Sequence, residues 1–182
     1  MTVENWPDLE SLFGPKGACG GCWCMWWRLT RSQFEQQKGE PNRQALKAIV
    51  DSGKTPGILA YQEDQPVAWC AIAPREEYPV LARSRILKPI DNKSVWSLVC
   101  LFVPKPFRRK GLSARLIQAA VDFAKEQGAS IIEGYPIDTD KDRYPDAFAY
   151  TGFYPVFKEL GFEECIRRSE TRPIMRLTVQ KK

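Results

Sequence analysis

The apolar positions of the chain are densest in a strand that is followed by a helix and a second strand. Residues 95–103 are apolar and carry no charge, which is typical of a strand covered on both faces. In residues 112–127 the apolar positions recur at helical spacing and leave one polar face, and Gly128 follows as a C-terminal cap. Residues 130–134 are mostly apolar again. A strand, a helix and a strand in this order predict a right-handed crossover between parallel strands.

Shorter patterns complete an α/β arrangement around this unit. Two apolar runs joined by a polar turn predict a hairpin, and the run CWCMWW at residues 22–27 predicts a further strand. We therefore expect one domain over residues 1–182, with a mixed sheet flanked by helices. The expected elements are helices at 6–13, 32–38, 42–52, 80–84 and 154–160, hairpin strands at 57–62 and 66–73, and final, mutually paired strands at 162–165 and 173–179.

A basic turn, Arg-Arg-Lys-Gly at residues 108–111, joins the strand at 95–103 to the helix at 112–127. A glycine turn leaves several backbone N–H groups free at the start of a helix, where the helix dipole is positive. Such groups bind anions, and three adjacent cations favour phosphate. We interpret this turn as the functional centre of the chain.

Composition narrows the possible chemistry. The chain contains no histidine, which excludes Ser-His-Asp catalysis, Cys-His catalysis and histidine-ligated metals. Its net charge of +5 suits an anionic small molecule, such as a nucleotide or a coenzyme, better than long nucleic acid. No apolar run reaches the roughly 18 residues of a membrane helix, and the first residues lack the pattern of a signal peptide. We therefore expect a cytoplasmic protein with no membrane and no nucleic-acid partner.

Three of the six cysteines, Cys19, Cys22 and Cys24, lie close together in the Cys- and Trp-rich segment 1–30. They could bind zinc with Cys165 as a fourth ligand, because thiolates are common zinc ligands. The interleaved tryptophans favour reduced cysteines that pack in or beside a pocket. We therefore expect no bound metal. Most tryptophans are interpreted as core, with one or two lining an acceptor pocket as the alternative.

Two motifs in the right order resemble the GNAT superfamily of acyl-CoA-dependent N-acyltransferases. Residues 108–113, Arg-Arg-Lys-Gly-Leu-Ser, are similar to the family's coenzyme motif Arg/Gln-x-x-Gly-x-Gly/Ala, and Phe107 supplies the usual preceding aromatic residue. Residues 157–162, Phe-Lys-Glu-Leu-Gly-Phe, are similar to the Leu-Gly-Phe signature that closes a short helix in the family. The resemblance covers residues 57–165 and implies an α/β fold with a mixed, splayed central sheet.

The resemblance also implies where acetyl-CoA binds. The backbone amides of residues 109–113 would hold the pyrophosphate, and exposed backbone at residues 101–103 would pair with the pantetheine arm like an added strand. A backbone N–H near the splay would polarise the thioester carbonyl. The residues expected to contact the coenzyme are Leu101, Phe102, Val103, Arg108, Arg109, Lys110, Gly111, Leu112, Ser113 and Phe157.

The chain departs from the family pattern at the catalytic acid. The family's usual tyrosine, which protonates the leaving thiolate, is replaced by Phe157. Tyr154, one turn earlier, is our first substitute and Tyr150 is the second. As general base we favour Glu133, a carboxylate inside an apolar strand, over the acidic pair at 76–77. A salt-bridged structural carboxylate is the alternative interpretation of Glu133.

We therefore expect an N-acetyltransferase in which a primary amine of a small molecule or a peptide attacks the thioester of acetyl-CoA directly. Two alternatives stay open. One is a non-catalytic module on the same fold that binds acyl-CoA or an aromatic ligand, and the other is a zinc-stabilised interaction module built on Cys19, Cys22 and Cys24. We expect the protein to be a monomer or a homodimer.

Overall fold

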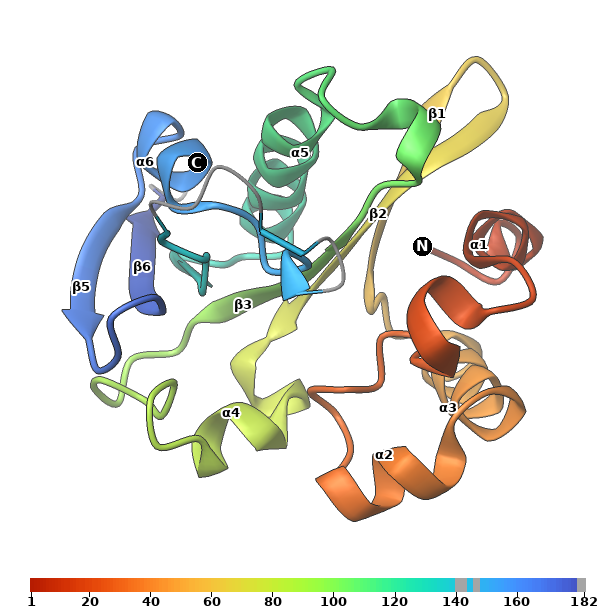
Figure 1. The fold of residues 1–182 in the computed structure, drawn as a ribbon, viewed down its shortest axis with the longest axis horizontal. Helices are drawn as coiled ribbons and strands as arrows, with labels where there is room; N and C mark the ends of the chain where they lie inside the picture. The colour runs from red at the N-terminus through yellow and green to blue at the C-terminus, as the bar shows by residue number, and fades with distance from the viewer. Residues whose placement is uncertain (140–143, 146–147, 180–182) are drawn as a thin grey trace.

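The computed structural model describes residues 1–139, 144–145 and 148–179, and a six-stranded mixed sheet forms its centre (Figure 1). The strand order is β1-β2-β3-β4-β6-β5. The strands are β1 (Gly57–Gln62), β2 (Gln65–Pro74), β3 (Trp96–Phe102), β4 (Ile131–Gly134), β5 (Glu163–Arg167) and β6 (Pro173–Thr178). The α-helices are α1 (Trp6–Phe13), α2 (Arg31–Gln37), α3 (Glu40–Asp51), α4 (Pro79–Arg83), α5 (Leu112–Glu126) and α6 (Tyr154–Glu159).

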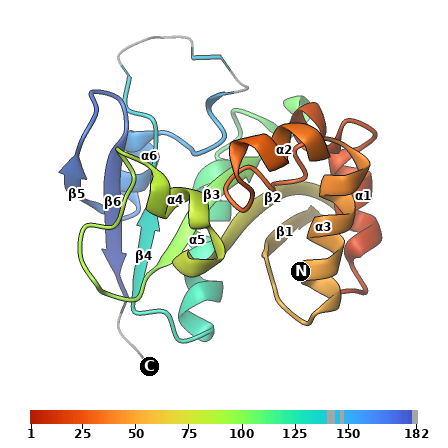
Figure 2. The same cartoon turned by 90° about the horizontal axis from the view of Figure 1, so that it is seen from below.

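Helices cover both faces of the sheet, and each face has its own hydrophobic core (Figure 2). On the face that we call the α5 face, Leu98 and Leu101 of β3 pack with Leu116 of α5 and Phe157 of α6. The other face, which we call the N-terminal face, is covered by α1 to α4 and the segments between them. Val99 of β3 packs on this second face, because neighbouring side chains of a strand point to opposite sides.

The strand, helix and strand predicted at the centre are confirmed as β3, α5 and β4. β3 and β4 are parallel, with Ser97 opposite Glu133. The hairpin is confirmed as the antiparallel pair β1–β2, and the final strands pair with each other as β5–β6. Among the described residues, no helix is both long and apolar enough to cross a membrane.

The predicted strand at residues 22–27 is wrong. Trp23 and Cys24 have φ angles of 43° and 55°, so two consecutive residues lie in the left-handed region, where a strand cannot continue. The segment instead forms turns, and Trp23, Cys24, Met25 and Trp27 are buried against the N-terminal face. The apolar composition therefore indicated burial correctly but not the backbone conformation.

A β-bulge in β3 lies where this strand leaves β4. Ala71 of β2 is opposite Cys100, and Ile72 is opposite Leu98, so Val99 is an extra residue on β3. In the described residues, β3 has no pair with β4 beyond Leu98, although β3 itself runs on for four more residues. The two parallel strands therefore separate after the bulge, which gives the splayed sheet that the sequence predicted.

Candidate active site

The turn between β3 and α5 presents backbone N–H groups at the start of a long helix. Arg109 and Gly111 have φ angles of 59° and 71°, and α5 begins at Leu112 and runs for 15 residues. Its N-cap is Gly111, which has no side chain to bind the first N–H groups. Left-handed residues in such a turn aim neighbouring N–H groups into one concave surface, and the helix dipole adds positive potential. The turn therefore has the geometry of an anion site, and exposed Arg109 and Lys110 add two cations.

The backbone edge at residues 101–103 is occupied by groups of the chain itself. The N–H of Leu101 donates to the carbonyl oxygen of Tyr150, with 2.6 Å between nitrogen and oxygen. The Nε of Arg108 donates to the carbonyl oxygen of Val103 at 2.7 Å. The prediction of exposed backbone at these residues is therefore corrected, because two of its hydrogen-bonding groups already have partners.

The segment 150–153 lies between β3 and the continuation of β4. Beyond β4, the N–H of Ile137 donates to the carbonyl oxygen of Gly152 at 2.8 Å, and the N–H of Tyr154 donates to Ile137 at 2.8 Å. Ile137 and Phe153 form a parallel bridge. Together with the bond from Leu101, these contacts make the segment a turn with one bridge residue, which connects β3 to the chain beyond β4 where the two strands separate.

The two candidate tyrosines point to different parts of the molecule. Burial, and then the carboxylate of Glu164 on β5, raise the pKa of Tyr154, whose hydroxyl bonds to that carboxylate. The ring of Tyr150 instead lies 6.5 Å from the ring of Trp27 on the N-terminal face. Burial raises the pKa of Tyr150 to about 12, against a smaller opposite effect of Arg172. Of the two, Tyr150 is the tyrosine beside the splay.

Phe157 fills the α5 side of the splay. It is fully buried, and its ring packs edge to face on Phe162 with 5.0 Å between centroids. A Cβ at Gly134 would overlap this ring, and a Cβ at Gly152 would lie 2.9 Å from it. The position that usually carries the family's acid is therefore next to the space between β3 and β4, but phenylalanine has no proton to donate there.

Glu133 is the centre of a buried ion cluster. Both of its carboxylate oxygens pair with arginines: Arg75 with one, and Arg176 with the other through Nε at 2.8 Å. The hydroxyl of Tyr135 donates to the same carboxylate at 2.8 Å and lies 2.7 Å from the hydroxyl of Ser97. This geometry agrees with the alternative interpretation, a salt-bridged structural carboxylate. An acidic residue in an apolar strand indicated that partners exist, but the sequence did not identify which residues they are.

The acidic pair at residues 76–77 directly follows Arg75, which belongs to the ion cluster around Glu133. Glu77 binds Arg28 at 3.0 Å and Lys54 at 2.6 Å. Burial works to raise the pKa of Glu77, but the hydrogen bond from Lys54 and the charge of Arg28 outweigh it, so the pKa is lowered. Glu76 is exposed. Glu77 is thus held as an ion-paired carboxylate.

Thiols and indoles that the sequence analysis did not connect surround the bulge. The Nε1 of Trp27 donates to the carbonyl oxygen of Val99 at 3.2 Å. The Nε1 of Trp69 donates to the Sγ of Cys24 at 3.1 Å, and this sulfur lies 3.6 Å from the Sγ of Cys100. The hydrogen bond with Cys100 is the main cause that raises the pKa of Cys24, so its thiol stays protonated. The N-terminal segment therefore fixes the bulge through side chains.

The four cysteines of the zinc hypothesis, Cys19, Cys22, Cys24 and Cys165, do not gather around a common point. Cys19 and Cys165 are exposed, and Cys165 lies on β5, whereas Cys24 is buried on the N-terminal face. Within the described part of the chain, no group of three cysteine or carboxylate side chains could hold a metal ion. The high pKa of Cys24 also opposes the thiolate form that zinc requires.

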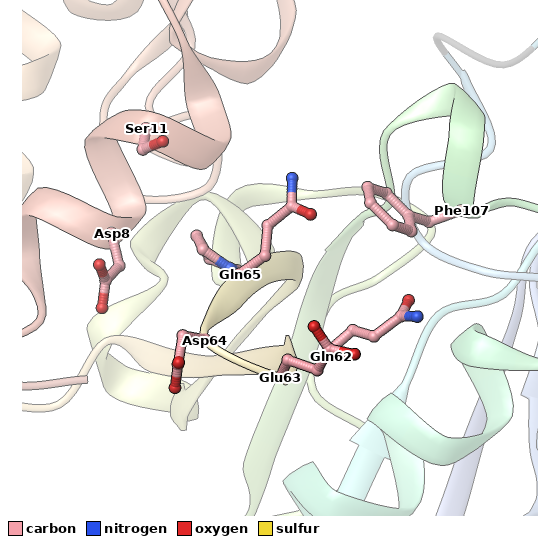
Figure 3. Close-up of a pocket in the computed structure, with 8 residues that line it drawn as sticks. Asp8, Ser11, Gln62, Glu63, Asp64, Gln65 and Phe107 are labelled. Carbon is pink, nitrogen blue, oxygen red and sulfur yellow. The ribbon is translucent and has the colours of Figure 1, made fainter.

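An open polar hollow of about 610 Å³ lies beside the anion site (Figure 3). Its walls come from α1, from the turn of the hairpin β1–β2 and from Phe107, which directly precedes the basic turn. The lining residues are Asp8, Ser11, Gln62, Glu63, Asp64, Gln65, Pro66 and Phe107. Its carboxylates make it unsuited to phosphate, so the anion site is confined to the turn and the helix start.

Comparisons with known proteins point to one family. Residues 23–153 match the family model described as Acetyltransferase (GNAT) family. The match begins well before residue 57, where the sequence resemblance began, and ends before the Leu-Gly-Phe signature. The search of curated proteins found no match.

Solved structures share the fold at low sequence identity. The chain is similar to a PaiA N-acetyltransferase from Thermoplasma acidophilum in complex with coenzyme A, with 12% identity, a TM-score of 0.53, and 98% of this chain and 96% of that chain covered. It is also similar to a ribosomal-protein-alanine N-acetyltransferase from Brucella melitensis, with 15% identity, a TM-score of 0.52, and 98% of this chain and 97% of that chain covered. An agmatine N-acetyltransferase variant has 12% identity and a TM-score of 0.54, with 98% of this chain and 97% of that chain covered.

Proposed function

Because the chain belongs to the GNAT acetyltransferase family, we propose that it transfers the acetyl group of acetyl-CoA to a primary amine. The observation that carries the proposal is the junction of β3 and α5. An anion-binding turn at residues 108–113 directly follows a strand that leaves its parallel neighbour after Leu98. This junction combines a phosphate site with a peptide edge, which are the two features that a coenzyme with a pyrophosphate and a peptide-like arm requires.

The donor binds along this junction. The amides of residues 109–113 hold the pyrophosphate, and Arg109 and Lys110 balance its charge. The pantetheine arm runs along residues 101–103. The N–H of Leu101 then faces the thioester carbonyl and polarises it, since charge develops on this oxygen as the amine attacks.

The reaction is a direct acyl transfer. The amine nitrogen forms a bond to the acetyl carbon, and the bond from that carbon to sulfur breaks. The amine loses a proton to water, and the leaving thiolate gains one. Tyr150 is the proposed donor of this second proton, because it is the candidate tyrosine next to Leu101 and a phenol is protonated at neutral pH. Glu133 has no assigned proton-transfer role, because two guanidinium groups and a phenol engage its oxygens.

The acceptor is an amine of a small molecule or of a peptide. Structures with the same fold are named for agmatine and for the alanine of a ribosomal protein, which represent both kinds of acceptor. Fold alone does not choose between them.

A coenzyme A release assay with a panel of amines and peptides tests the proposal. Acetyl-CoA should raise the melting temperature of the protein, and at least one acceptor should release free coenzyme A faster than water does. Binding without turnover across the panel would favour the non-catalytic binding module. If acetyl-CoA does not bind, both the proposed N-acetyltransferase and the non-catalytic acyl-CoA-binding module are contradicted.

A matched pair of charge variants locates the donor site. Ser113→Glu places a carboxylate in the first turn of α5, where it suits the helix dipole but repels the pyrophosphate. We expect it to weaken coenzyme A binding by about 100-fold or more, since two close like charges meet a site built for anions. Ala119→Glu adds the same charge on the exposed surface further along α5 and should leave binding unchanged.

A further inference from the structure

We propose that residues 150–153 form a displaceable strap that occupies the place of the pantetheine arm, so that strap closure and coenzyme binding exclude each other. The inference rests on the proposed function, because that function places the pantetheine between β3 and β4. It adds a regulatory element that belongs to this chain: the donor site is closed by its own backbone until the coenzyme displaces it.

The strap is a turn, but it offers one backbone carbonyl oxygen to each side of the gap, as an added strand would. The carbonyl oxygen of Tyr150 accepts from the N–H of Leu101 at 2.6 Å on one side. On the other side the carbonyl oxygen of Gly152 accepts from the N–H of Ile137 at 2.8 Å. The strap therefore bridges the two separated strands through its peptide groups. A pantetheine arm, which carries two amides, would need the same edge of β3.

The carbonyl of Tyr150 has the position expected of a ligand carbonyl. It is bound to Leu101, the amide that the proposed function assigns to the thioester. One N–H group on an edge cannot donate fully to two carbonyl oxygens in the same place. The thioester can therefore reach the amide of Leu101 only after the carbonyl of Tyr150 has left it.

Close packing leaves no room for a second chain beside the closed strap. Gly152 has a φ angle of +80°, and a Cβ on it would lie 2.9 Å from the ring of Phe157 and 3.0 Å from Cδ1 of Leu101. Thr151 is fully buried. Coenzyme binding thus requires movement of the strap and not only the loss of one hydrogen bond.

One side-chain bond anchors the strap from outside. The Nη1 of Arg172, at the start of β6, donates to the Oγ1 of Thr151 at 2.9 Å. Next to it, Phe153 is 38% exposed, so this end of the strap has little burial to lose. The strap moves aside and not away, because Tyr154 behind it begins α6, which stays packed through Phe157.

Binding measurements on strap variants test the competition. When the closed state dominates, weakening it by some factor raises the apparent affinity for a ligand of the open state by the same factor. Thr151→Val and Arg172→Gln each remove the anchoring bond, and each should lower the Kd for coenzyme A by about threefold to tenfold. Arg168→Gln is the matched control in the same turn, since the partners of Arg168 among the described residues are backbone carbonyls of the segment 86–89. It should leave the Kd unchanged.

Hydrogen exchange gives a second readout that does not depend on the variants. An ordinary ligand slows exchange around its site, but displacement of the strap should speed exchange at the amide of Ile137, because this amide loses the carbonyl oxygen of Gly152. We expect coenzyme A to accelerate exchange at this amide in the wild-type protein. In Ser113→Glu, which does not hold the pyrophosphate, coenzyme A should leave it unchanged.

The outcomes separate the two proposals. If coenzyme A binds the wild-type protein while Thr151→Val and Arg172→Gln match the control, the strap is overturned and the proposed function stands. Unchanged or slower exchange at the amide of Ile137 on binding overturns the strap in the same way. If the wild-type protein does not bind coenzyme A at all, the proposed function fails and the strap fails with it.

Discussion

The two faces of the central sheet are built in different ways. On the α5 face, one helix of 15 residues supplies the packing, and its first turn supplies the anion site. On the N-terminal face, four helices of 5 to 12 residues and the turns between them cover the sheet. Polar contacts hold these pieces, such as Trp27 on Val99 and Arg75 on Glu133. A site made of backbone amides, such as the turn before α5, requires only one regular junction between a strand and a helix. A site made of side chains requires several segments that are distant in the sequence to be held in place.

Both faces bury apolar side chains, but only the N-terminal face adds many polar contacts to this burial. Apolar burial on the α5 face is tolerant of exposed substitutions. The buried charges and hydrogen bonds of the N-terminal face are costly to leave without partners. Five substitutions or conditions test the two faces, and the expected effects decrease from the first to the last.

Loss of the Glu133 carboxylate should have the largest effect. Glu133→Ala leaves the half-buried Arg75 without its carboxylate partner and leaves Arg176 with Asp91 as its remaining partner, and we expect the free energy of unfolding to fall by about 3 kcal/mol. Urea unfolding followed by circular dichroism measures it. The same change at Glu126, an exposed residue of α5, should alter stability by less than about 0.5 kcal/mol. Similar small losses for both variants would contradict the difference between the faces.

Removal of the Tyr150 hydroxyl should lower turnover without affecting coenzyme binding. Tyr150→Phe keeps the backbone carbonyl and the ring, so we expect the Kd for coenzyme A to be unchanged and kcat to fall by about 100-fold. Tyr154→Phe, whose hydroxyl faces Glu164, should change kcat much less. A larger loss of kcat in Tyr154→Phe would reverse the assignment.

The pH dependence of Tyr150 follows from its environment. Because burial raises its pKa to about 12, the phenol should keep its proton up to that pH, and the stability that it contributes is lost only as pH rises above about 10 and through 12. We therefore expect the kcat of the wild-type protein to show no loss below pH ~10 that comes from ionisation of Tyr150. A loss in this range that disappears in Tyr150→Phe would contradict this. Such a loss would show a phenol that ionises in the normal range.

Loss of the indole N–H of Trp27 should weaken the bulge. Trp27→Phe keeps an aromatic ring but leaves the buried carbonyl of Val99 without this donor, so we expect a loss of about 1–2 kcal/mol in unfolding free energy. Trp26→Phe is the matched control, because the half-buried Trp26 contributes mainly a ring contact with Phe34. Equal losses in the two variants would mean that ring size matters and the hydrogen bond does not.

Acid should remove the smallest contribution, at the exposed end of the ion cluster. The hydrogen bond from Arg176, and then the backbone N–H of Lys93, lower the pKa of Asp91 to about 2. Since the folded pKa lies below the unfolded value near 3.8, Asp91 stabilises the fold above pH ~4, and this effect is lost as pH falls towards 2. The stability difference between the wild type and Asp91→Asn should therefore shrink over that range. A difference that stays constant down to pH 2 would contradict the assigned pKa.

The sequence predicted the α5 face and the junction of β3 with α5 well for physical reasons. Helical periodicity, a glycine N-cap and a strand without charge are local patterns, and together they identify the β3–α5–β4 unit. The coenzyme motif of residues 108–113 is local too. Its geometry follows from left-handed Arg109 and Gly111 at one helix start.

The N-terminal face could not be predicted to the same depth. Its conformation at Trp23 and Cys24 depends on two left-handed residues that are not glycine, so no local pattern indicates it. Contacts such as Trp27 with Val99 join residues 72 positions apart. The bond between Leu101 and Tyr150 was missed for the same reason, since an edge that is free in a strand pattern can be filled by a distant segment.

The single extra residue in β3, Val99, determines which face of the sheet each later side chain of this strand points to. Side chains alternate along a strand, so Val99 shifts the alternation by one, and both Val99 and Cys100 face the N-terminal side while Leu101 returns to the α5 side. Deletion of one residue here would exchange the two sides for Leu101 and Phe102, although the composition of the strand would hardly change. The site thus tolerates many substitutions in this strand more readily than a change in its length.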